Sequence, residues 1–368
     1  MKAITTAEMQ ELDRRTMREF EVPGEVLMDR AGMGVAEVVR RVAQTARMGH
    51  PLVQLFAGRG NNGGDAFVAA RYLKELDFDV QVFLAGEVAS LRGDALEHLM
   101  KMKAAGVALQ ELPETEDWAD LYDDPQACGD ILVDGLLGTG IRGPARGLAA
   151  AAIQVINRFA EFAHIVAIDA PSGLDTDTGA AEGDVVTADI TATMGLPKIG
   201  LVQPAAIEYV GSLDVIDIGI PSELWAGITA PIEAITGFDI RPLLPRRRRT
   251  SHKGVFGHVL LIGGTPGYTG AMSLAAMAAT RSGAGLVSVL TPASLVPIIA
   301  DIVPEAMVHA GRTGPTGALT ADALEHWGKP LSMFSAILVG PGMGNSEDTR
   351  AIVETVCATM AQIGRAHV

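Results

Sequence analysis

Residues 52–65 read LVQLFAGRGNNGGD: a short apolar run, then a glycine-rich turn that leads into a helical pattern. Gly58, Gly60 and Gly63 fit G-x-G-x-x-G in the strand–turn–helix context that this motif requires. Such loops hold dinucleotide phosphates, although a tight turn with no ligand is the alternative interpretation. Because a carboxylate is repelled by a pyrophosphate, Asp65 fits better if the loop also handles a cation or a ribose hydroxyl.

The same alternation of short apolar runs and helical segments extends to both sides of this loop. Further strands are predicted at 80–85, 131–134, 165–169, 190–194 and 213–218, and helices at 6–18, 25–48, 67–76, 94–104 and 148–162. The first helix has the capping-box spacing of Thr5 and Glu8. This alternation predicts a parallel sheet covered by helices on both faces, a Rossmann-like three-layer α/β/α domain over residues 1–225.

A proline- and arginine-rich break, DIRPLLPRRRRTSHK at 239–253, separates this domain from a second α/β pattern. We place a linker at 226–250 and interpret its run of four arginines as solvated, with a nucleic-acid or targeting patch as the alternative. Strands are predicted at 259–262, 286–290 and 336–339, with a helix at 271–281. Three strands are too few to close a doubly wound core, so we expect 251–368 to be incomplete. Whether 363–368 are native stays open.

Charge and composition exclude several classes of protein. The net charge of −15 argues against a nucleic-acid-binding body, while backbone N–H groups can still bind anions. Cys128 and Cys357 form no disulfide framework or metal spacing. The N-terminus has no apolar signal core, and the longest uncharged stretch, Gly283–Ala300, contains two prolines. These features predict a cytoplasmic protein without nucleic-acid or membrane partners.

Two further polar loops follow predicted strands. The first, DGLLGTGIRGP at 134–144, begins with Asp134, and its glycines expose N–H groups that can form an anion-binding concavity. The second, DAPSGLD at 169–175, begins with Asp169. A helix N-cap at Asp134 and an Asx turn at Asp169 are the alternatives without chemistry. Because ligands bind at the carboxyl ends of parallel strands, we expect all three loops to meet in one crevice.

The three loops, followed by Lys198-Ile199-Gly200, resemble the signature of the NAD(P)H-hydrate epimerase family. The resemblance covers residues 1–225 and implies interconversion of the R and S epimers of hydrated NADH or NADPH. It also implies a bound potassium ion and self-association into a homo-oligomer. Asn62, Asp134 and Ser172 would supply oxygen ligands to the potassium, which suits hard donors of this kind. Ala66 departs from the pattern, because glycine is common there in the family.

The resemblance also places the hydrated nucleotide and suggests the acid–base groups. The substrate-binding positions would be Asn61, Asn62, Gly63, Gly64, Asp65, Gly138, Thr139, Gly140, Ile141, Arg142, Gly143, Pro144 and Asp169. Epimerisation requires the C–O bond or the ring to open and to reclose from the other face, which needs a proton acceptor and donor. Asp169 is the first candidate and Lys198 the second, with a surface lysine on a turn as the alternative.

The second half resembles the ADP-dependent NAD(P)H-hydrate dehydratase family, which has a ribokinase-like fold. The similar segments are 252–258, 263–271, 281–287, 304–307 and 340–344, the last reading GPGMG. The resemblance implies hydrate contacts at Ala271 and Gly344, and ADP with magnesium in the full-length protein. The nucleotide loop and catalytic aspartate of the family would lie beyond residue 368, so we expect a partial ribokinase-like α/β domain that is inactive by itself. His252 and His258 are interpreted as structural.

The sequence therefore predicts a bifunctional NAD(P)H-hydrate repair enzyme that is shortened at its C-terminus, in which the epimerase acts and the dehydratase half completes repair only in the full-length protein. One alternative is an NAD-dependent dehydrogenase, with Asp77 or Asp79 as the acidic ribose ligand. A ribokinase-like small-molecule kinase is the second alternative. A non-catalytic protein-interaction module is the third, and the presence of Asn62, Asp134 and Asp169 counts against it.

Overall fold

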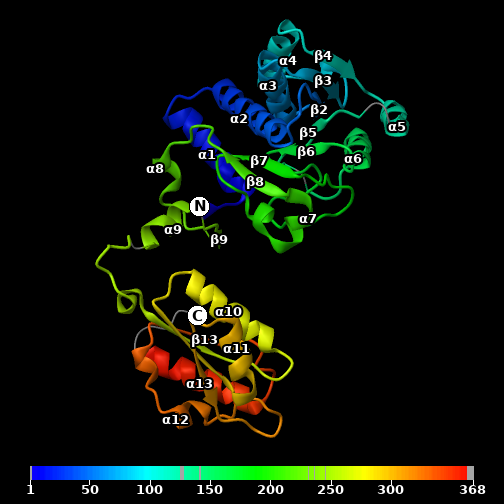
Figure 1. Ribbon diagram of the computed structural model, residues 1–368. Helices are drawn as coiled ribbons and strands as arrows, with labels where there is room; N and C mark the ends of the chain where they lie inside the picture. The colour runs from blue at the N-terminus through cyan, green and yellow to red at the C-terminus, as the bar shows by residue number, and fades with distance from the viewer. Residues whose placement is uncertain are drawn as a thin grey trace. The chain divides into compact units, whose positions relative to one another are not determined.

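A computed structural model describes residues 2–124, 128–140, 142–230, 232–235, 237–244 and 246–362. The chain divides into two compact units, Met1–Leu243 and Leu244–Val368. The division falls inside the segment that the sequence assigns to the linker (Figure 1).

The described part of the first unit is built on a seven-stranded sheet of order β4-β3-β2-β5-β6-β7-β8, in which all neighbours are parallel. The strands are β2 (Leu52–Ala57), β3 (Asp79–Leu84), β4 (Ala108–Glu111), β5 (Ile131–Gly135), β6 (His164–Ile168), β7 (Ile190–Met194) and β8 (Ser212–Ile216). The strand order reverses between β2 and β5. A crevice forms outside the carboxyl ends of the strands at such a reversal, so the predicted Rossmann-like α/β architecture is confirmed.

Helices cover both faces of this sheet (Figure 1). The helices of this unit are α1 (Thr6–Glu19), α2 (Gly24–Thr45), α3 (Asn61–Glu75), α4 (Gly93–Ala104), α5 (Thr115–Asp123), α6 (Leu148–Arg158), α7 (Ile207–Val210), α8 (Ser222–Trp225) and α9 (Gly237–Ile240). Helices α2, α3 and α4 share one buried apolar cluster with the sheet, and α5 and α6 share the other. On α2, Val35, Val38, Val39 and Val42 are all buried, as their helical spacing predicts.

The glycine-rich segment differs from the predicted loop, because α3 begins at Asn61 and already contains Gly63 and Gly64. Glycine disfavours a helix by about 1 kcal/mol per residue relative to alanine. Packing overrides this preference: a Cβ on Gly63 would lie 1.9 Å from the carbonyl oxygen of Gly58, and one on Gly64 would lie 2.6 Å from the sulfur of Met28. Strand β4 was not predicted, since it has no apolar run and only one of its side chains is even half-buried.

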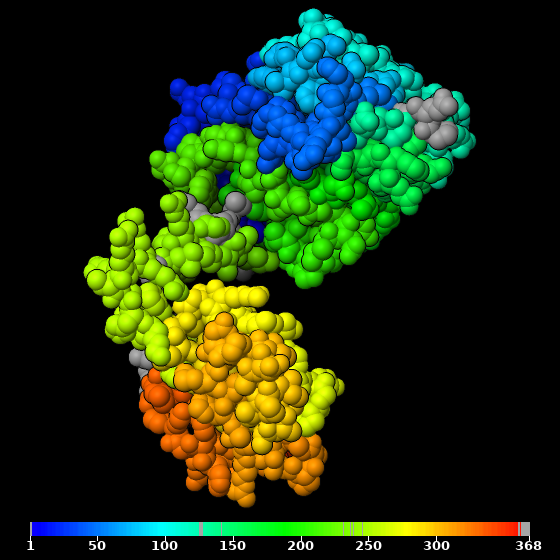
Figure 2. All heavy atoms as spheres, viewed as in Figure 1, coloured from blue at the N-terminus to red at the C-terminus, as the bar shows by residue number. Residues whose placement is uncertain are grey.

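The N-terminal segment is fixed to later parts of the chain. The predicted capping box is confirmed: Thr5 N donates to Glu8 Oε2 at 2.7 Å, and Glu8 N donates to Thr5 Oγ1 at 3.2 Å. Strand β1 (Lys2–Ala3) pairs antiparallel with β9 (Ile232–Glu233). Residues 232–233, which the sequence assigns to the linker, therefore pair with the N-terminus. Figure 2 shows the atoms of the N-terminal segment, in blue, against the green atoms of later residues of the same unit. An ion pair between Arg41 of α2 and Asp214 of β8 joins the two segments.

The second unit contains a four-stranded parallel sheet of order β12-β11-β10-β13 within its described residues. Its elements are β10 (His258–Ile262), α10 (Thr269–Arg281), β11 (Leu286–Pro292), α11 (Val296–Ile302), β12 (Met307–Gly311), α12 (Ala323–Trp327), β13 (Ala336–Val339) and α13 (Glu347–Gln362). The expectation of three strands without a core is wrong. Strand β12 was missed because none of its side chains is fully buried, and apolar clusters around Phe334 and Met272 show that this unit has a core.

Short 3-10 helices complete the described elements: η1 (Val88–Ser90), η2 (Ile199–Val202), η3 (Pro204–Ala206), η4 (Arg241–Leu243), η5 (Lys253–Phe256), η6 (Ala293–Leu295) and η7 (Leu331–Met333). Within the described ranges, none of the helices has the length and apolar character needed to cross a membrane.

We predict that Gly63→Ala destabilises the first unit. The added Cβ would meet the Gly58 carbonyl oxygen at 1.9 Å, and overpacking of this kind costs about 1–3 kcal/mol, which exceeds the gain in helix propensity of about 1 kcal/mol at most. Urea unfolding followed by tryptophan fluorescence in a Trp327→Phe background would report on the first unit. Gly49→Ala is the control, since a Cβ there meets nothing within 4 Å. Equal midpoints for both variants would contradict the packing argument.

Candidate active site

A cleft of about 680 Å³ opens at the carboxyl edge of the first sheet. Its walls come from α1, α2, the start of α3, and the loops after β2, β5 and β6. The residues predicted from the sequence that line it are Asn61, Asn62, Asp65, Gly138, Thr139, Gly140, Asp169 and Lys198. All three polar loops therefore reach one cleft, at the point where the strand order reverses.

Other predicted binding residues lie outside the lining of this cleft. Gly63 and Gly64 pack against neighbouring segments. Arg142 forms ion pairs with Asp177 at 2.6 Å and with Asp175 at 3.5 Å. Gly143 takes a positive φ of 77° and Pro144 packs beside Gly183. The predicted contact at Ile141 lies outside the described residues.

Ala66, the departure from the epimerase pattern, is fully buried. Its Cβ lies where a side chain on Gly135 would have to go, 2.8 Å from an ideal Cβ there. The extra methyl group therefore packs against β5 and does not line the cleft.

The carboxyl group of Asp134 is buried at the end of β5 and is bonded only to neutral groups. Ser172 donates to it twice, from Oγ to Oδ1 at 2.6 Å and from N to Oδ2 at 2.7 Å, and Leu136 N donates to Oδ1 at 3.2 Å. Helix α6 begins only at Leu148, so Asp134 is no helix N-cap and that alternative is wrong. Burial raises the pKa of Asp134 to about 6, although these hydrogen bonds act to lower it.

Asn62 and Ser172 both contact the backbone carbonyl of Leu137, and Ser172 also donates to Asp134. Asn62 Nδ2 donates to Leu137 O at 3.0 Å, and Ser172 Oγ lies 3.2 Å from the same oxygen. The three predicted potassium ligands are therefore grouped around one point. Amide, carboxylate and hydroxyl oxygens are hard donors, and no basic side chain pairs with Asp134 among the described residues. Since a buried carboxylate needs a counter-charge, this donor set fits a hard cation.

The described residues contain no group of three or more His, Cys, Asp or Glu side chains that could hold a metal ion. One carboxylate among neutral oxygens is the donor set of a cation of low charge. It is unlike a zinc site, which is built from nitrogen and sulfur ligands.

Asp169 and Lys198 form an ion pair in the wall of the cleft. Lys198 Nζ donates to Asp169 Oδ1, to Thr193 Oγ1 at 3.0 Å and to Met194 O at 3.2 Å. Only 1% of Lys198 is exposed, so the alternative of a surface lysine is wrong. The turn that carries Lys198 is fixed against the N-terminus by an isolated parallel β-bridge between Ile4 and Lys198, which includes the hydrogen bond from Ile199 N to Ile4 O.

Asp169 is held in a left-handed backbone conformation, with φ of +64°. This conformation costs a residue other than glycine about 1 kcal/mol or more, and aspartate and asparagine tolerate it best. Asp169 N donates to Ala192 O at 2.8 Å, and Met194 N donates to the carboxyl at 3.1 Å. The turn after β6 therefore aims the Asp169 carboxyl at Lys198, and the Asx-turn interpretation does not account for its contacts.

The sequence analysis missed Asp13 and Arg59, which also line the cleft. Asp13 lies on α1 midway between Met9 and Met17, at the i+4 spacing of the helix face that lines the cleft. An acidic residue at such a position was the available signal. Burial raises the pKa of Asp13 to about 6; Asp169 also raises it and Lys198 opposes both. Arg59 was hidden in the glycine-rich segment.

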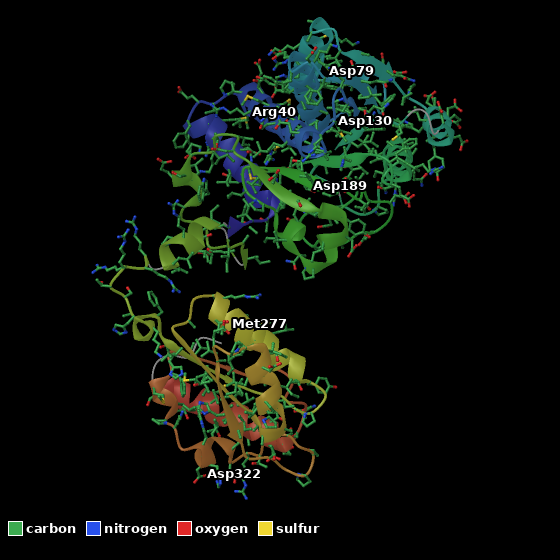
Figure 3. All side chains as sticks on the ribbon, in the orientation of Figure 1. Arg40, Asp79, Asp130, Asp189, Met277 and Asp322 are labelled. Carbon is green, nitrogen blue, oxygen red and sulfur yellow. The ribbon has the colours of Figure 1, made fainter. Side chains whose placement is uncertain are left out.

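Asp77 and Asp79, the predicted ribose ligands of the dehydrogenase alternative, do not lie at the carboxyl edge of the first sheet. Asp79 begins β3, and Asp77 lies just before it, whereas the cleft lies at the carboxyl ends of the strands (Figure 3). Strand β3 ends at Leu84, and the first carboxylate after it is Glu87, which is not one of the predicted ribose ligands and does not line the cleft. The predicted acidic partner of an NAD-dependent dehydrogenase is therefore wrong for both residues.

In the second unit, Ala271 and Gly344 lie near the corresponding edge. Ala271 follows β10 in the first turn of α10, and Gly344 follows the adjacent β13. A Cβ on Gly342 would lie 3.4 Å from the Cβ of Ala271. The two predicted contact segments thus meet where the strand order of this sheet reverses.

The fold and the cleft define a Rossmann-like α/β protein with an aspartate–lysine ion pair in a cleft at the carboxyl edge of its sheet. Two families match the chain. One is described as YjeF-related protein N-terminus and matches residues 24–200, and the other is described as NAD(P)H-hydrate dehydratase and matches residues 259–363.

Relatives match along nearly the whole chain. A protein of Moorella thermoacetica named bifunctional NAD(P)H-hydrate repair enzyme Nnr is 40% identical, over 96% of this chain and 66% of the relative. The protein of the same name from Pyrobaculum aerophilum is 35% identical, over 98% of this chain and 68% of the relative. A solved ADP/ATP-dependent NAD(P)H-hydrate dehydratase from Bacillus subtilis, co-crystallised with ATP/Mg²⁺, is 28% identical over 33% of this chain and 41% of that chain, with a TM-score of 0.28.

The chain belongs to the family of bifunctional NAD(P)H-hydrate repair enzymes, as its sequence indicated. It spans slightly less than two thirds of the Moorella relative, 66%. The match to the dehydratase family runs to residue 363, so the expectation that the second half is only an inactive fragment is not supported.

We predict that Asp65→Asn stabilises the first unit increasingly as the pH rises. Burial, together with the nearby charges of Asp169 and Asp13, raises the pKa of Asp65 well above 3.8. The folded state thus holds this proton more firmly than the unfolded chain, and the resulting stability is lost as the pH rises through the raised pKa. Asparagine removes this loss.

Urea unfolding at several pH values from about 4 to about 8 would measure the effect. The free energy of unfolding of Asp65→Asn should gain on the wild type across that range. Asp79→Asn is the control, because Asp79 is exposed at the amino end of β3. A difference between Asp65→Asn and the wild type that does not change with pH would refute the prediction.

Proposed function

We propose that the first unit interconverts the R and S epimers of hydrated NADH and NADPH. The observation that carries the proposal is the pairing of Asp169 and Lys198 in a cleft that Asn62 also lines. Asp134 and Ser172, buried behind that wall, are joined to Asn62 through the backbone of Leu137 and Leu136. Membership of the repair-enzyme family supports the substrate. The dehydrogenase alternative has lost both of its predicted ribose ligands, Asp77 and Asp79. A cleft lined by an aspartate–lysine pair disfavours a non-catalytic protein-interaction module.

The start of α3 would bind the pyrophosphate of the dinucleotide. Helix N-termini present free N–H groups and positive dipole ends, which favour anions. Gly60 is the N-cap of this helix, and Arg59 adds a cation at the rim of the cleft. The carboxyl of Asp65, one turn further, is placed for a neutral group such as a ribose hydroxyl, since a phosphate would be repelled.

Asp169 would exchange the proton of the substrate hydroxyl. Its Oδ1 accepts hydrogen bonds from Lys198 Nζ, Thr193 Oγ1 and Met194 N, while Oδ2 accepts none from the described residues. Oδ2 is therefore free to accept a proton. Lys198 is itself fixed by its bonds to Thr193 and Met194, so its bond to Oδ1 fixes the orientation of the Asp169 carboxyl.

A potassium ion would be held by Asn62, Asp134 and Ser172. When bound, it would supply positive charge to the buried edge of the cleft and could orient an oxygen of the substrate. The Asp134 carboxylate, buried without a basic partner, is the residue that most needs this charge.

The second unit would carry the dehydration of the S epimer back to NAD(P)H, with ADP and magnesium as co-reactant and cofactor in the whole protein. Ala271 and Gly344 would contact the hydrate. A ribokinase-like small-molecule kinase remains the other candidate for this unit, and only hydrate loss that depends on ADP separates the two. A homo-oligomeric state and a cytoplasmic location complete the proposal.

The proposed activity predicts that this chain interconverts the two epimers, and that Asp169→Asn lowers the rate at least about 100-fold. Asparagine keeps the shape and tolerates the left-handed backbone but cannot exchange the proton. NMR or HPLC of R and S hydrated NADH, with protein-free rates subtracted, would measure it. Asp79→Asn should match the wild type. Hydride transfer to a carbonyl substrate, or an unchanged rate in Asp169→Asn, would refute the proposal.

The proposed cation site predicts that the interconversion rate rises with potassium. Asn62→Ala should raise the potassium concentration for half-maximal rate by about tenfold or more, because it removes one oxygen ligand. Titrating potassium chloride at constant ionic strength with tetramethylammonium would measure it, with Glu11→Gln as a variant remote from the oxygen cluster. Identical potassium dependence in Asn62→Ala and the wild type would exclude Asn62 as a ligand.

A further inference from the structure

Asp13 stands in the wall of the cleft without a hydrogen-bond partner. Its Oδ1 is buried, and no group among the described residues donates to it. A buried carboxyl oxygen without a donor is unfavourable, and such groups in native proteins are concentrated where function requires them. Packing gives no reason for an aspartate at this position.

Helix α1, which carries Asp13, is fixed at its amino end by hydrogen bonds from Ile4 and Thr6 to later parts of the chain. Thr6 N donates to Asp177 Oδ1 at 2.7 Å, and Thr6 Oγ1 lies 2.8 Å from Thr176 Oγ1. Ile4 N donates to Pro197 O at 2.9 Å, directly before Lys198. Helix α1 is thereby tied to the turn that carries the Asp169 partner, and its inward face covers the cleft.

Lys198 has no N–H donor left for a hydrogen bond to Asp13. An ammonium group has three N–H donors, and those of Lys198 are used by Asp169 Oδ1, Thr193 Oγ1 and Met194 O. The charged groups that face Asp13 are Lys198 and Asp169, and Asp65 faces the same cleft. Asp169 thus has an ammonium partner, while Asp13 shares the site with two other carboxyl groups. Burial raises the pKa of Asp13 to about 6 against the opposing charge of Lys198, so the environment of Asp13 favours its protonated form.

We propose that Asp13 is the second acid–base residue of the first unit, the proton donor that complements Asp169. The proposal rests on the epimerase function proposed above. It assigns opposite roles to two carboxyl groups in one cleft, Asp169 as acceptor and Asp13 as donor at the start of the reaction.

The step balances as a ring opening. In the hydrate, the hydroxylated carbon is bonded to the ring nitrogen. Asp169 takes the hydroxyl proton, the O–H electron pair becomes the second bond of a carbonyl, the carbon–nitrogen bond breaks, and its electron pair takes the Asp13 proton. After rotation about the adjacent C–C bond, nitrogen adds to the other face of the carbonyl. Asp13 then regains its proton and Asp169 returns its own to the oxygen, so no other reactant is needed.

The test compares Asp13→Asn, Asp13→Glu and Glu11→Gln in the 368-residue chain. Asparagine has the shape of aspartate but cannot donate the proton, so kcat should fall at least about 100-fold while KM changes little. Glutamate should restore part of kcat. Glu11 lies on the same helix, exposed and paired with Arg14, so Glu11→Gln should match the wild type.

Two readouts separate proton donation from a structural role. The wild-type rate should fall as the pH rises past about 6, the pKa of Asp13, because the protonated form is required; the profile of Asp13→Asn should lack this fall. The melting temperature of Asp13→Asn should not drop, since Oδ1 loses no partner. A lowered melting temperature together with an inactive Asp13→Glu would assign Asp13 to structure and overturn the proposal.

The remaining outcomes distinguish this inference from the function on which it rests. A wild-type chain that does not interconvert the epimers overturns the proposed function and the role of Asp13 with it. An active wild type with an unchanged kcat or pH profile in Asp13→Asn overturns the role of Asp13 alone.

Discussion

The first unit depends on a direct backbone contact at the point where its strand order reverses. Gly58 N donates to Gly135 O at 3.0 Å, and ideal Cβ atoms on Gly58 and Gly63 would each lie 1.9 Å from a carbonyl oxygen. This contact closes the turn between β2 and α3 against the end of β5. It brings Asn62 within hydrogen-bond reach of Leu137 O. The oxygen cluster at Asp134 and the open end of α3 both follow from it.

The cleft concentrates carboxyl groups in a setting that disfavours their charges. Asp13, Asp65 and Asp169 line it and Asp134 is buried behind its wall, whereas among the described residues one buried lysine pairs with only one of the four. Burial without a counter-charge reduces the stability of the folded state above the normal pKa of a carboxyl. Left-handed backbone at Asp169 adds strain. A fold selected for stability alone would replace these groups with apolar ones, so their presence is best explained by proton transfer and by cation binding.

Each unit places its predicted contacts by the same topological rule. In the first, β2 and β5 flank the reversal and the cleft lies beyond their ends. In the second, β10 and β13 flank it, and the segments of Ala271 and Gly344 follow them. Parallel strands end at one edge, so residues far apart in sequence meet there without any local signal linking them.

The sequence by itself determined the class of fold, the order of the main elements and the polar strand-end loops that reach the cleft, because these are encoded locally. Apolar runs mark buried strands, and a polar residue that ends a strand must lie at the sheet edge. Tertiary structure alone decided the rest. Exposed β4 and half-buried β12 carry no apolar run. The two glycines of α3 are needed because the Gly58 carbonyl and the Met28 side chain leave no room for a Cβ at Gly63 and Gly64. The burial of Lys198 and the role of Asp13 depend on packing between the N-terminal helix and a turn almost 200 residues away, which no local pattern records.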